Sequence, residues 1–397
     1  METMEQLYQS NFKDNAYPFY EKMRDKQPVF QMSDGTPATW LVTKYDDVKE
    51  MLKAPGFLKD QTKLIQRTPD DDDVKEITIF ENMMLDVDPP DHTRLRKLVQ
   101  PYFHPKTIKE LTPRISEIAD DLIEQMKKKG GPVDLIDDYA FPLPIIVISE
   151  MLGVPAEDRD KFRKWSNSIV AASNEEDTDF AADVEAFTTY LTDLFEKRKQ
   201  NPTDDLVSYL IQTEEDGEQL SRQELYSMIF LLIIAGHETT VNLIGNTMLA
   251  LFEHPDQLDS VKKDASLIPG AVEEGLRYYS PVDFSTARWA ADDMEFRGQT
   301  IRRGDMVLAS ISSANRDNDK FEKADAFDVT RKSNGHVAFG FGIHFCLGAP
   351  LARLEGNIAL EKLFASLPAI TIDPNGEAPE WRSIFLLRGL RSLPVTW

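Results

Sequence analysis

The chain has 397 residues, and its 45 Lys and Arg against 68 Asp and Glu give a formal net charge of −23. This acidic balance disfavours nucleic acids and anionic membrane surfaces as partners, because both attract basic proteins. The only cysteine, Cys346, excludes an intrachain disulfide and a multi-cysteine metal cluster. The hydrophobic share of 41% is sufficient for a large core.

The first half of the chain carries short elements followed by helices. The pattern predicts a helix near Tyr17 to Lys26 and strands around Pro28 to Gln31 and Thr39 to Thr43. We interpret the acidic run Asp70 to Asp73 as a solvated loop. From residue 87 to about 206, apolar residues recur at helical spacing and are broken by Pro and Gly, which predicts a series of packed helices.

One helix is defined more sharply than the others. Ser221 followed by Glu224 forms a capping box, and the helical pattern then continues to a stop at Pro255. Its segment from Met228 to Ala235 is apolar on most faces, so we expect this helix to be central. That apolar run is too short to span a bilayer, and the N-terminus lacks the features of a secretory signal. We therefore expect a cytoplasmic protein.

Strands and turns follow Pro281, where FRGQTIRRGDMVLASISS alternates between apolar and polar residues. Helices nevertheless dominate the chain, and strands are a minority near its two ends. No linker or repeat divides the sequence. The expected fold class is mainly α with minor β, in a single domain over residues 1–397.

Cys346 lies between glycines, directly before a helix that should begin at Ala349. A helix N-terminus lowers the pKa of a thiol and stabilises the thiolate. The thiol could be an inert buried group, a nucleophile or a metal ligand. Glycines beside it allow a flat, bulky partner to approach the backbone, which favours the metal ligand.

The pattern Phe339, Gly342, Cys346 and Gly348 resembles the haem-binding loop of the cytochrome P450 family. AGHETT, from Ala235 to Thr240, is similar to the oxygen-activation segment of that family. The resemblance covers essentially the whole chain. It implies the cytochrome P450 fold, a single large triangular helical domain with small sheets, here without a fused reductase.

The resemblance also implies roles for individual residues. Cys346 would be the axial ligand of haem b iron, and Glu238 with Thr239 would deliver protons. Glu274, Arg277 and Arg331 would have a structural role. The haem contacts implied by position in the family are His92, Arg96, Arg288, His344, Phe339, Gly340, Ala235, Gly236 and Gly348.

The implied activity is that of a haem-thiolate monooxygenase, which activates dioxygen and hydroxylates a C–H bond. Electrons would come from a separate ferredoxin and an NAD(P)H-dependent ferredoxin reductase, and the protein would be a monomer. A basic island on the acidic chain suits docking of an acidic ferredoxin. Its members are Arg94, Arg96, Lys97, Lys106 and Lys109.

The expected substrate is bulky and hydrophobic, because the residues placed in the pocket by position in the family are mostly apolar. These residues are Met83, Met84, Leu85, Leu231, Ala235, Thr239, Phe284, Ser285, Leu386 and Leu387. The overall sequence of the chain is similar to that of bacterial family members that act on polyketides and macrolides. A polyketide, macrolide or statin-like lactone is thus the first expectation, and steroids, terpenoids or fatty acids are alternatives. Other classes are a haem-thiolate sensor, a peroxide-using enzyme and a non-haem thiol enzyme.

Overall fold

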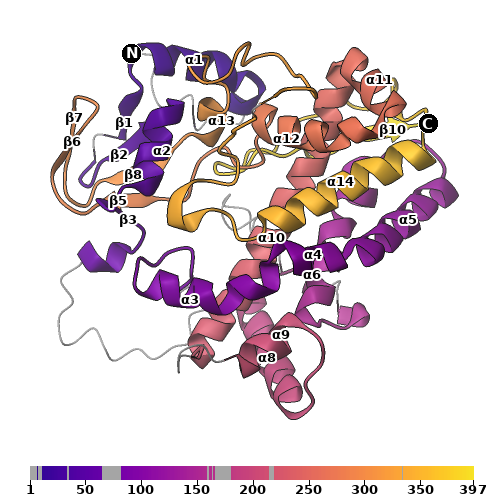
Figure 1. The fold of residues 1–397 in the computed structure, drawn as a ribbon, viewed down its shortest axis with the longest axis horizontal. Coiled ribbons are helices and arrows are strands. Elements are labelled where there is room, and N and C mark those ends of the chain that lie inside the picture. The colour runs from indigo at the N-terminus through magenta and orange to yellow at the C-terminus, as the bar shows by residue number, and fades with distance from the viewer. Residues whose placement is uncertain are drawn as a thin grey trace.

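The computed structural model describes residues 7, 11–33, 35–64, 82–158, 161–162, 164–165, 180–213, 219–332 and 334–397. The protein is 57% helical and has only small sheets, as the sequence predicts. In Figure 1 the larger sheet lies on one side of the molecule, and long helices fill the other. The acidic run Asp70 to Asp73 lies outside the described residues.

The larger sheet has five strands in the order β1-β2-β8-β5-β3. β2 pairs with β8 in parallel, and the other three pairings are antiparallel. The sheet thereby joins the N-terminal part of the chain to residues 288–309. Its strands are β1 (Val29–Ser33), β2 (Thr39–Val42), β3 (Phe57–Leu58), β5 (Arg288–Ala290) and β8 (Met306–Ala309).

Two smaller sheets complete the strands. One has the order β4-β10-β9, and the other is the antiparallel pair β6-β7. Their bounds are β4 (Val133–Asp134), β6 (Met294–Phe296), β7 (Gln299–Ile301), β9 (Thr371–Ile372) and β10 (Pro394–Thr396). The two strands predicted before residue 44 are confirmed as β1 and β2.

The predicted series of helices is confirmed. Several helices have a proline in the first turn, where no backbone N–H is needed. The α-helices are α1 (Ala16–Lys26), α2 (Tyr45–Lys53), α3 (Asp91–Val99), α4 (Pro105–Glu110), α5 (Thr112–Lys129), α6 (Pro142–Leu152), α8 (Phe180–Gln200), α9 (Leu206–Gln212), α10 (Arg222–Glu253), α11 (Pro255–Lys263), α12 (Ile268–Tyr278), α13 (Ile311–Ala314) and α14 (Ala349–Ser366).

α10 is the central helix, as expected. Ser221 and Glu224 form the predicted capping box, and the helix ends at Glu253, before Pro255. It packs against α6, α12 and α14 and crosses the middle of the molecule in Figure 1. By length and composition α10 could cross a membrane, but 78% of its most apolar window is buried inside the protein. It is a core helix.

Candidate active site

Cys346 lies at the end of a tight loop directly before α14. Its backbone N–H donates to the carbonyl oxygen of Phe339 at 2.9 Å, which closes the loop. Gly340 and Gly342 have φ angles of 72° and 82°, in the region that favours glycine. A Cβ on Gly342 would also lie 3.0 Å from the carbonyl oxygen of Leu52. The loop conformation therefore depends on both glycines.

The Cys346 thiol accepts backbone hydrogen bonds from Gly348 and Ala349 at the start of α14. The thiol is exposed to the cavity, but desolvation by the surrounding protein raises its pKa above the ordinary value, and these two amides offset part of that effect. The start of the helix therefore lowers the thiol pKa as expected, but desolvation outweighs it and the net shift is upward. A deprotonated sulfur here needs a bound cation such as a metal ion.

A cavity of about 290 Å³ opens in front of the thiol. It is lined by the cysteine loop, α10, α3 and the segment from Ser285 to Arg288. Beside the thiol, a Cβ on Gly348 would meet no atom within 4 Å, so there is room for a bulky group. Among the described residues, none of those that line the cavity is Asp or Glu. Most are Leu, Ile, Val, Met, Phe, Ala or Gly, so the cavity suits an apolar ligand.

α10 contributes Ala235, Gly236 and Thr239 to the wall of this cavity. The Thr239 hydroxyl donates to the carbonyl oxygen of Ala235, one turn earlier, at 2.8 Å. Since this bond uses the hydroxyl hydrogen, the oxygen of Thr239 can accept a hydrogen bond from a group in the cavity.

Glu238 does not line the cavity with Thr239. Its side chain is 2% exposed and forms an ion pair with Arg382. Burial raises the pKa of Glu238, and Arg382 opposes that rise. The prediction placed an acid beside the hydroxyl; instead, the acid is held by a basic residue near the C-terminus.

Four basic or imidazole side chains gather at one end of the cavity: His92, Arg96, Arg288 and His344. The two imidazole rings lie 4.1 Å apart. Burial lowers the pKa of His92 to about 4 and that of His344 to about 2, so both rings are neutral at pH 7. The Nε2 atom of each ring is buried without a hydrogen-bond partner. Such atoms need a partner, and a ligand with carboxylates would supply one.

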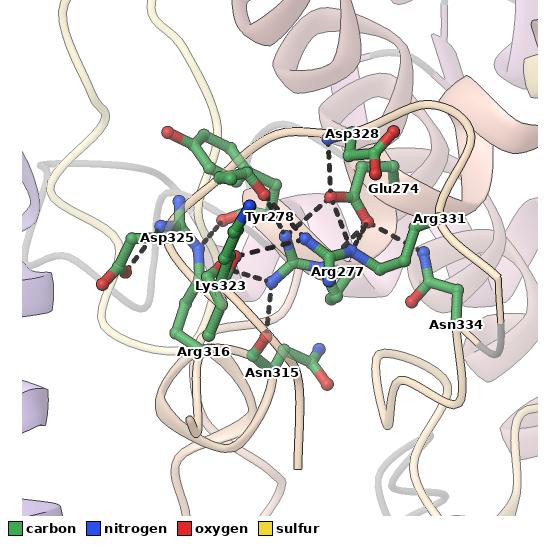
Figure 2. A network of polar contacts seen from close by, with 12 residues as sticks. Glu274, Arg277, Tyr278, Asn315, Arg316, Lys323, Asp325, Asp328, Arg331 and Asn334 are labelled. Carbon is green, nitrogen blue, oxygen red and sulfur yellow. Dashed lines mark hydrogen bonds and ion pairs between the residues drawn. The ribbon is translucent and has the colours of Figure 1, made fainter. Parts of the chain in front are cut away.

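Figure 2 shows a polar network around the buried pair Glu274 and Arg277 of α12. Arg277 binds both carboxylate oxygens of Glu274 at 2.7 and 2.8 Å, and Arg331 approaches the same carboxylate at 3.1 Å. Arg277 also donates to the carbonyl oxygen of Asn315, whose side chain accepts from the Val337 N–H at 2.8 Å. The network thus connects α12 to the segment that leads into the loop.

The basic island predicted between residues 92 and 109 is divided in the structure. Arg94 pairs with Glu224 at the start of α10, and Arg96 faces the cavity. Lys97, Lys106 and Lys109 are exposed. The two arginines therefore do not belong to an exposed basic surface, and the candidate docking surface consists of the three exposed lysines.

The family model "Cytochrome P450" matches residues 3–372 of this chain. The chain is a cytochrome P450. A "Cytochrome P450" of Bacillus subtilis is 44% identical and covers 100% of this chain and 97% of the relative. The "Vitamin D(3) 25-hydroxylase" of Pseudonocardia autotrophica is 45% identical, with coverage of 98% and 96%.

The "Polyketide biosynthesis cytochrome P450 PksS" of Bacillus subtilis is 42% identical and covers 97% of this chain and 96% of the relative. Its solved structure has a TM-score of 0.90 and covers 98% of each chain. These matches confirm the cytochrome P450 fold and identify the chain as a P450 monooxygenase, an oxidoreductase of the bacterial branch.

The residues present fit the haem iron group that the family implies. In this P450 the single thiol, the open space beside Gly348 and the unpaired Nε2 atoms of His92 and His344 face one cavity. A haem would bring an iron that a thiolate can bind and two propionates that cations and imidazoles can bind. Cys346 would hold the iron, and the residues expected to contact the propionates are His92, Arg96, Arg288 and His344.

Six residues expected in the substrate pocket line the cavity of this P450: Met84, Leu85, Leu231, Ala235, Thr239 and Ser285. Four others do not line it: Met83, Phe284, Leu386 and Leu387. Phe284 stacks on Phe385, in a cluster with the N-terminal residues. The Phe284 ring is thus directed away from the cavity that Ser285 lines. Leu386 is 37% exposed, and Met83 packs against the main core.

Three functional candidates were missed by the sequence reasoning. Arg382 holds Glu238, and Lys59 lines the cavity as a buried cation. Glu355, on α14, interacts with Thr240, and burial raises its pKa to about 8. Glu355 lies nine residues after the cysteine, on the helix predicted to begin at Ala349, and its position beside the cysteine loop was a signal for a functional acid. Lys59 and Arg382 gave no such signal, because their positions depend on distant segments.

Proposed function

We propose that this P450 holds haem b through Cys346 and hydroxylates a bulky hydrophobic substrate in the cytoplasm. The observation that carries the proposal is one apolar cavity bounded by both Cys346 and Thr239. The protein would act as a single haem domain and a monomer. It would receive electrons from a separate ferredoxin and ferredoxin reductase.

The first substrate class is a polyketide, macrolide or statin-like lactone. The apolar lining supports a hydrophobic ligand, and the printed name of PksS associates that relative with polyketide biosynthesis. A steroid, terpenoid or fatty acid is the alternative. The name of the vitamin D(3) 25-hydroxylase supports the steroid-like class.

When bound, haem supplies the reduction of dioxygen and the transfer of an oxygen atom to the substrate. The residues of this chain orient the substrate, exclude water and supply protons. Thr239 presents its hydroxyl oxygen to the cavity while its hydrogen is held by the Ala235 carbonyl. We assign proton supply to Thr239 together with Glu238, which has to leave Arg382 to reach the cavity.

The cofactor is tested by spectroscopy of the purified, haem-reconstituted protein. The ferrous carbonyl form should show the strongly red-shifted Soret band of thiolate ligation. Cys346→Ser should lose that band. A wild-type protein that takes up no haem would overturn the proposal.

The role of Thr239 is tested with Thr239→Ala. This variant should keep the Soret spectrum but form less product per electron consumed. Thr188→Ala is a matched control, because the Thr188 hydroxyl on α8 also bonds the carbonyl one turn earlier, at 2.8 Å, without lining the cavity. Equal coupling in Thr239→Ala and Thr188→Ala would remove Thr239 from proton supply.

The exposed lysines on α3 and α4 are proposed to dock an acidic ferredoxin. α4 packs against α14, the helix that begins beside the cysteine loop, which supports this side of the molecule as the docking side. Opposite charges accelerate association, and salt weakens that effect. The same surface would recognise the native partner.

Charge reversal tests the docking surface. Lys106→Glu with Lys109→Glu should slow reduction by ferredoxin roughly tenfold at low salt, and less at high salt. Lys127→Glu with Lys128→Glu, on the exposed end of α5, is a control with the same change in net charge. Similar reduction rates in both double variants would make α4 irrelevant to docking.

A further inference from the structure

Lys59 is a buried cation that belongs to the cavity wall. Its side chain is 2% exposed and lines the cavity just after β3. Nζ donates to the Thr286 hydroxyl and to the Ala287 carbonyl, both at 2.9 Å. The nearest carboxylate is that of Asp86, at 3.4 Å, and the Asp86 side chain is 40% exposed.

Lys59 differs from the four residues expected to contact the haem. His92 and His344 have unpaired Nε2 atoms, so they lack a partner that the haem would bring. Two of the three hydrogens of the Lys59 ammonium already have neutral acceptors at good distance, which fixes where the third one points. This third position has only the longer contact with Asp86.

Three cations line the cavity, Lys59, Arg96 and Arg288, and among the described lining residues there is no carboxylate. The two propionates of a bound haem would balance two of these charges. The third charge would have only Asp86, which pairs with Lys59 at 3.4 Å from outside the lining. Burial lowers the pKa of Lys59 to about 8, so at pH 7 its charged form still predominates by about ten to one. A buried, incompletely paired ammonium attracts an anion.

We propose that Lys59 is an anion-binding subsite that holds the carboxylate of an otherwise hydrophobic substrate. The inference rests on the proposed function and deepens it, since it selects an amphiphilic acid from the hydrophobic compounds. The substrate carboxylate takes the third position of the ammonium in place of Asp86. Asp86 can turn to solvent at little cost because its side chain is already partly exposed.

The position of the subsite suits this role. Asp86 follows Met84 and Leu85, and Thr286 follows Ser285; all three preceding residues line the cavity. The cation therefore lies where two walls meet, with apolar surface beyond it. An acid with a long apolar chain would place its carboxylate at Lys59 and its chain against the remaining lining.

Isothermal titration calorimetry of the holoprotein with dodecanoate and 1-dodecanol tests the subsite. Dodecanoate should bind about tenfold more tightly than the alcohol, a difference that one charged hydrogen bond supplies. Lys59→Met should abolish this preference without weakening the binding of 1-dodecanol. Asp86→Asn should strengthen the binding of dodecanoate but not that of 1-dodecanol, because it removes the carboxylate that competes for Lys59. Lys63→Met is the matched control, since Lys63 is 39% exposed, contacts Asp88 and does not line the cavity.

Three results would overturn the proposal. Equal affinities of the wild-type protein for the two ligands would do so without any variant. Equal weakening of both ligands by Lys59→Met would show a structural role, and faster haem loss from Lys59→Met with unchanged ligand preference would assign Lys59 to the propionates. Calorimetry measures binding and not product formation, so a dodecanoate preference without any hydroxylated product would leave the subsite standing while the proposed function fails.

Discussion

Replacing Arg277 by Lys should strongly destabilise the protein although the charge is kept. Arg277 is fully buried and donates five hydrogen bonds: two to Glu274 and one each to the carbonyl oxygens of Asn315, Ala324 and Ala326. In the variant, Arg331 would still donate to Glu274 and to the Ala326 carbonyl. Within the described residues, the carbonyls of Asn315 and Ala324 have no second donor.

A lysine offers three donors from one point, so it cannot replace a planar guanidinium that spans these groups. Two buried carbonyls left unpaired at about 1–3 kcal/mol each give an expected loss of about 2–6 kcal/mol. That is a large part of the about 5–15 kcal/mol that keeps a typical protein folded.

Urea unfolding followed by tryptophan fluorescence measures this loss, and Soret absorbance follows the cysteine loop in the same samples. Arg114→Lys is the control, because Arg114 makes its ion pairs with Glu117 and Glu150 at the surface, where such pairs contribute about 0–1 kcal/mol. A loss below about 1 kcal/mol in Arg277→Lys would refute the assignment of stability to these carbonyl bonds.

Two further predictions concern buried acids. The pKa of Glu355 is about 8 in the folded protein, against an ordinary value of 4.5. The unfolded state therefore releases this proton first, and the acid lowers the stability of the folded protein progressively as pH rises from about 4.5 to 8. Glu355→Gln should thus be more stable than the wild type by about 4 kcal/mol at pH 8 and about equal near pH 4.5 in urea unfolding, and a pH-independent difference would contradict the shift. Arg382→Ala should lower the free energy of unfolding by about 1–3 kcal/mol, because it leaves Glu238 buried without its cation. Most of this loss should vanish when Glu238→Gln is also present. Additive losses in the double variant would show that the pair is not coupled.

Local chemistry made much of the fold and the cysteine loop predictable. The capping box at Ser221 and the stop at Pro255 define α10 in the sequence because both act on adjacent backbone groups. The glycines around Cys346 were equally informative, since the positive φ angles at Gly340 and Gly342 exclude most other residues.

Side-chain direction and long-range pairing were not predictable in the same way. Phe284 and Ser285 are adjacent in the sequence. Which of the two side chains faces the cavity depends on how their backbone pairs with the segment around Ser310. Arg382 reaches Glu238 only because the C-terminal segment folds back over α10, and Lys59 becomes buried only when Thr286 and Ala287 meet it. No local pattern in the sequence encodes these contacts.

The parallel pairing of β2 with β8 has a consequence for synthesis of the chain on the ribosome. Val42 pairs with Ala309, so about 265 further residues must be added before β2 finds its partner, which takes roughly 15–50 s at 5–20 residues per second. During that time the hairpin β1-β2 has an open edge on the β8 side, and such edges bind other strands. Until β8 is made, this edge exposes the nascent N-terminal segment to pairing with other chains, and a chaperone bound there would prevent it.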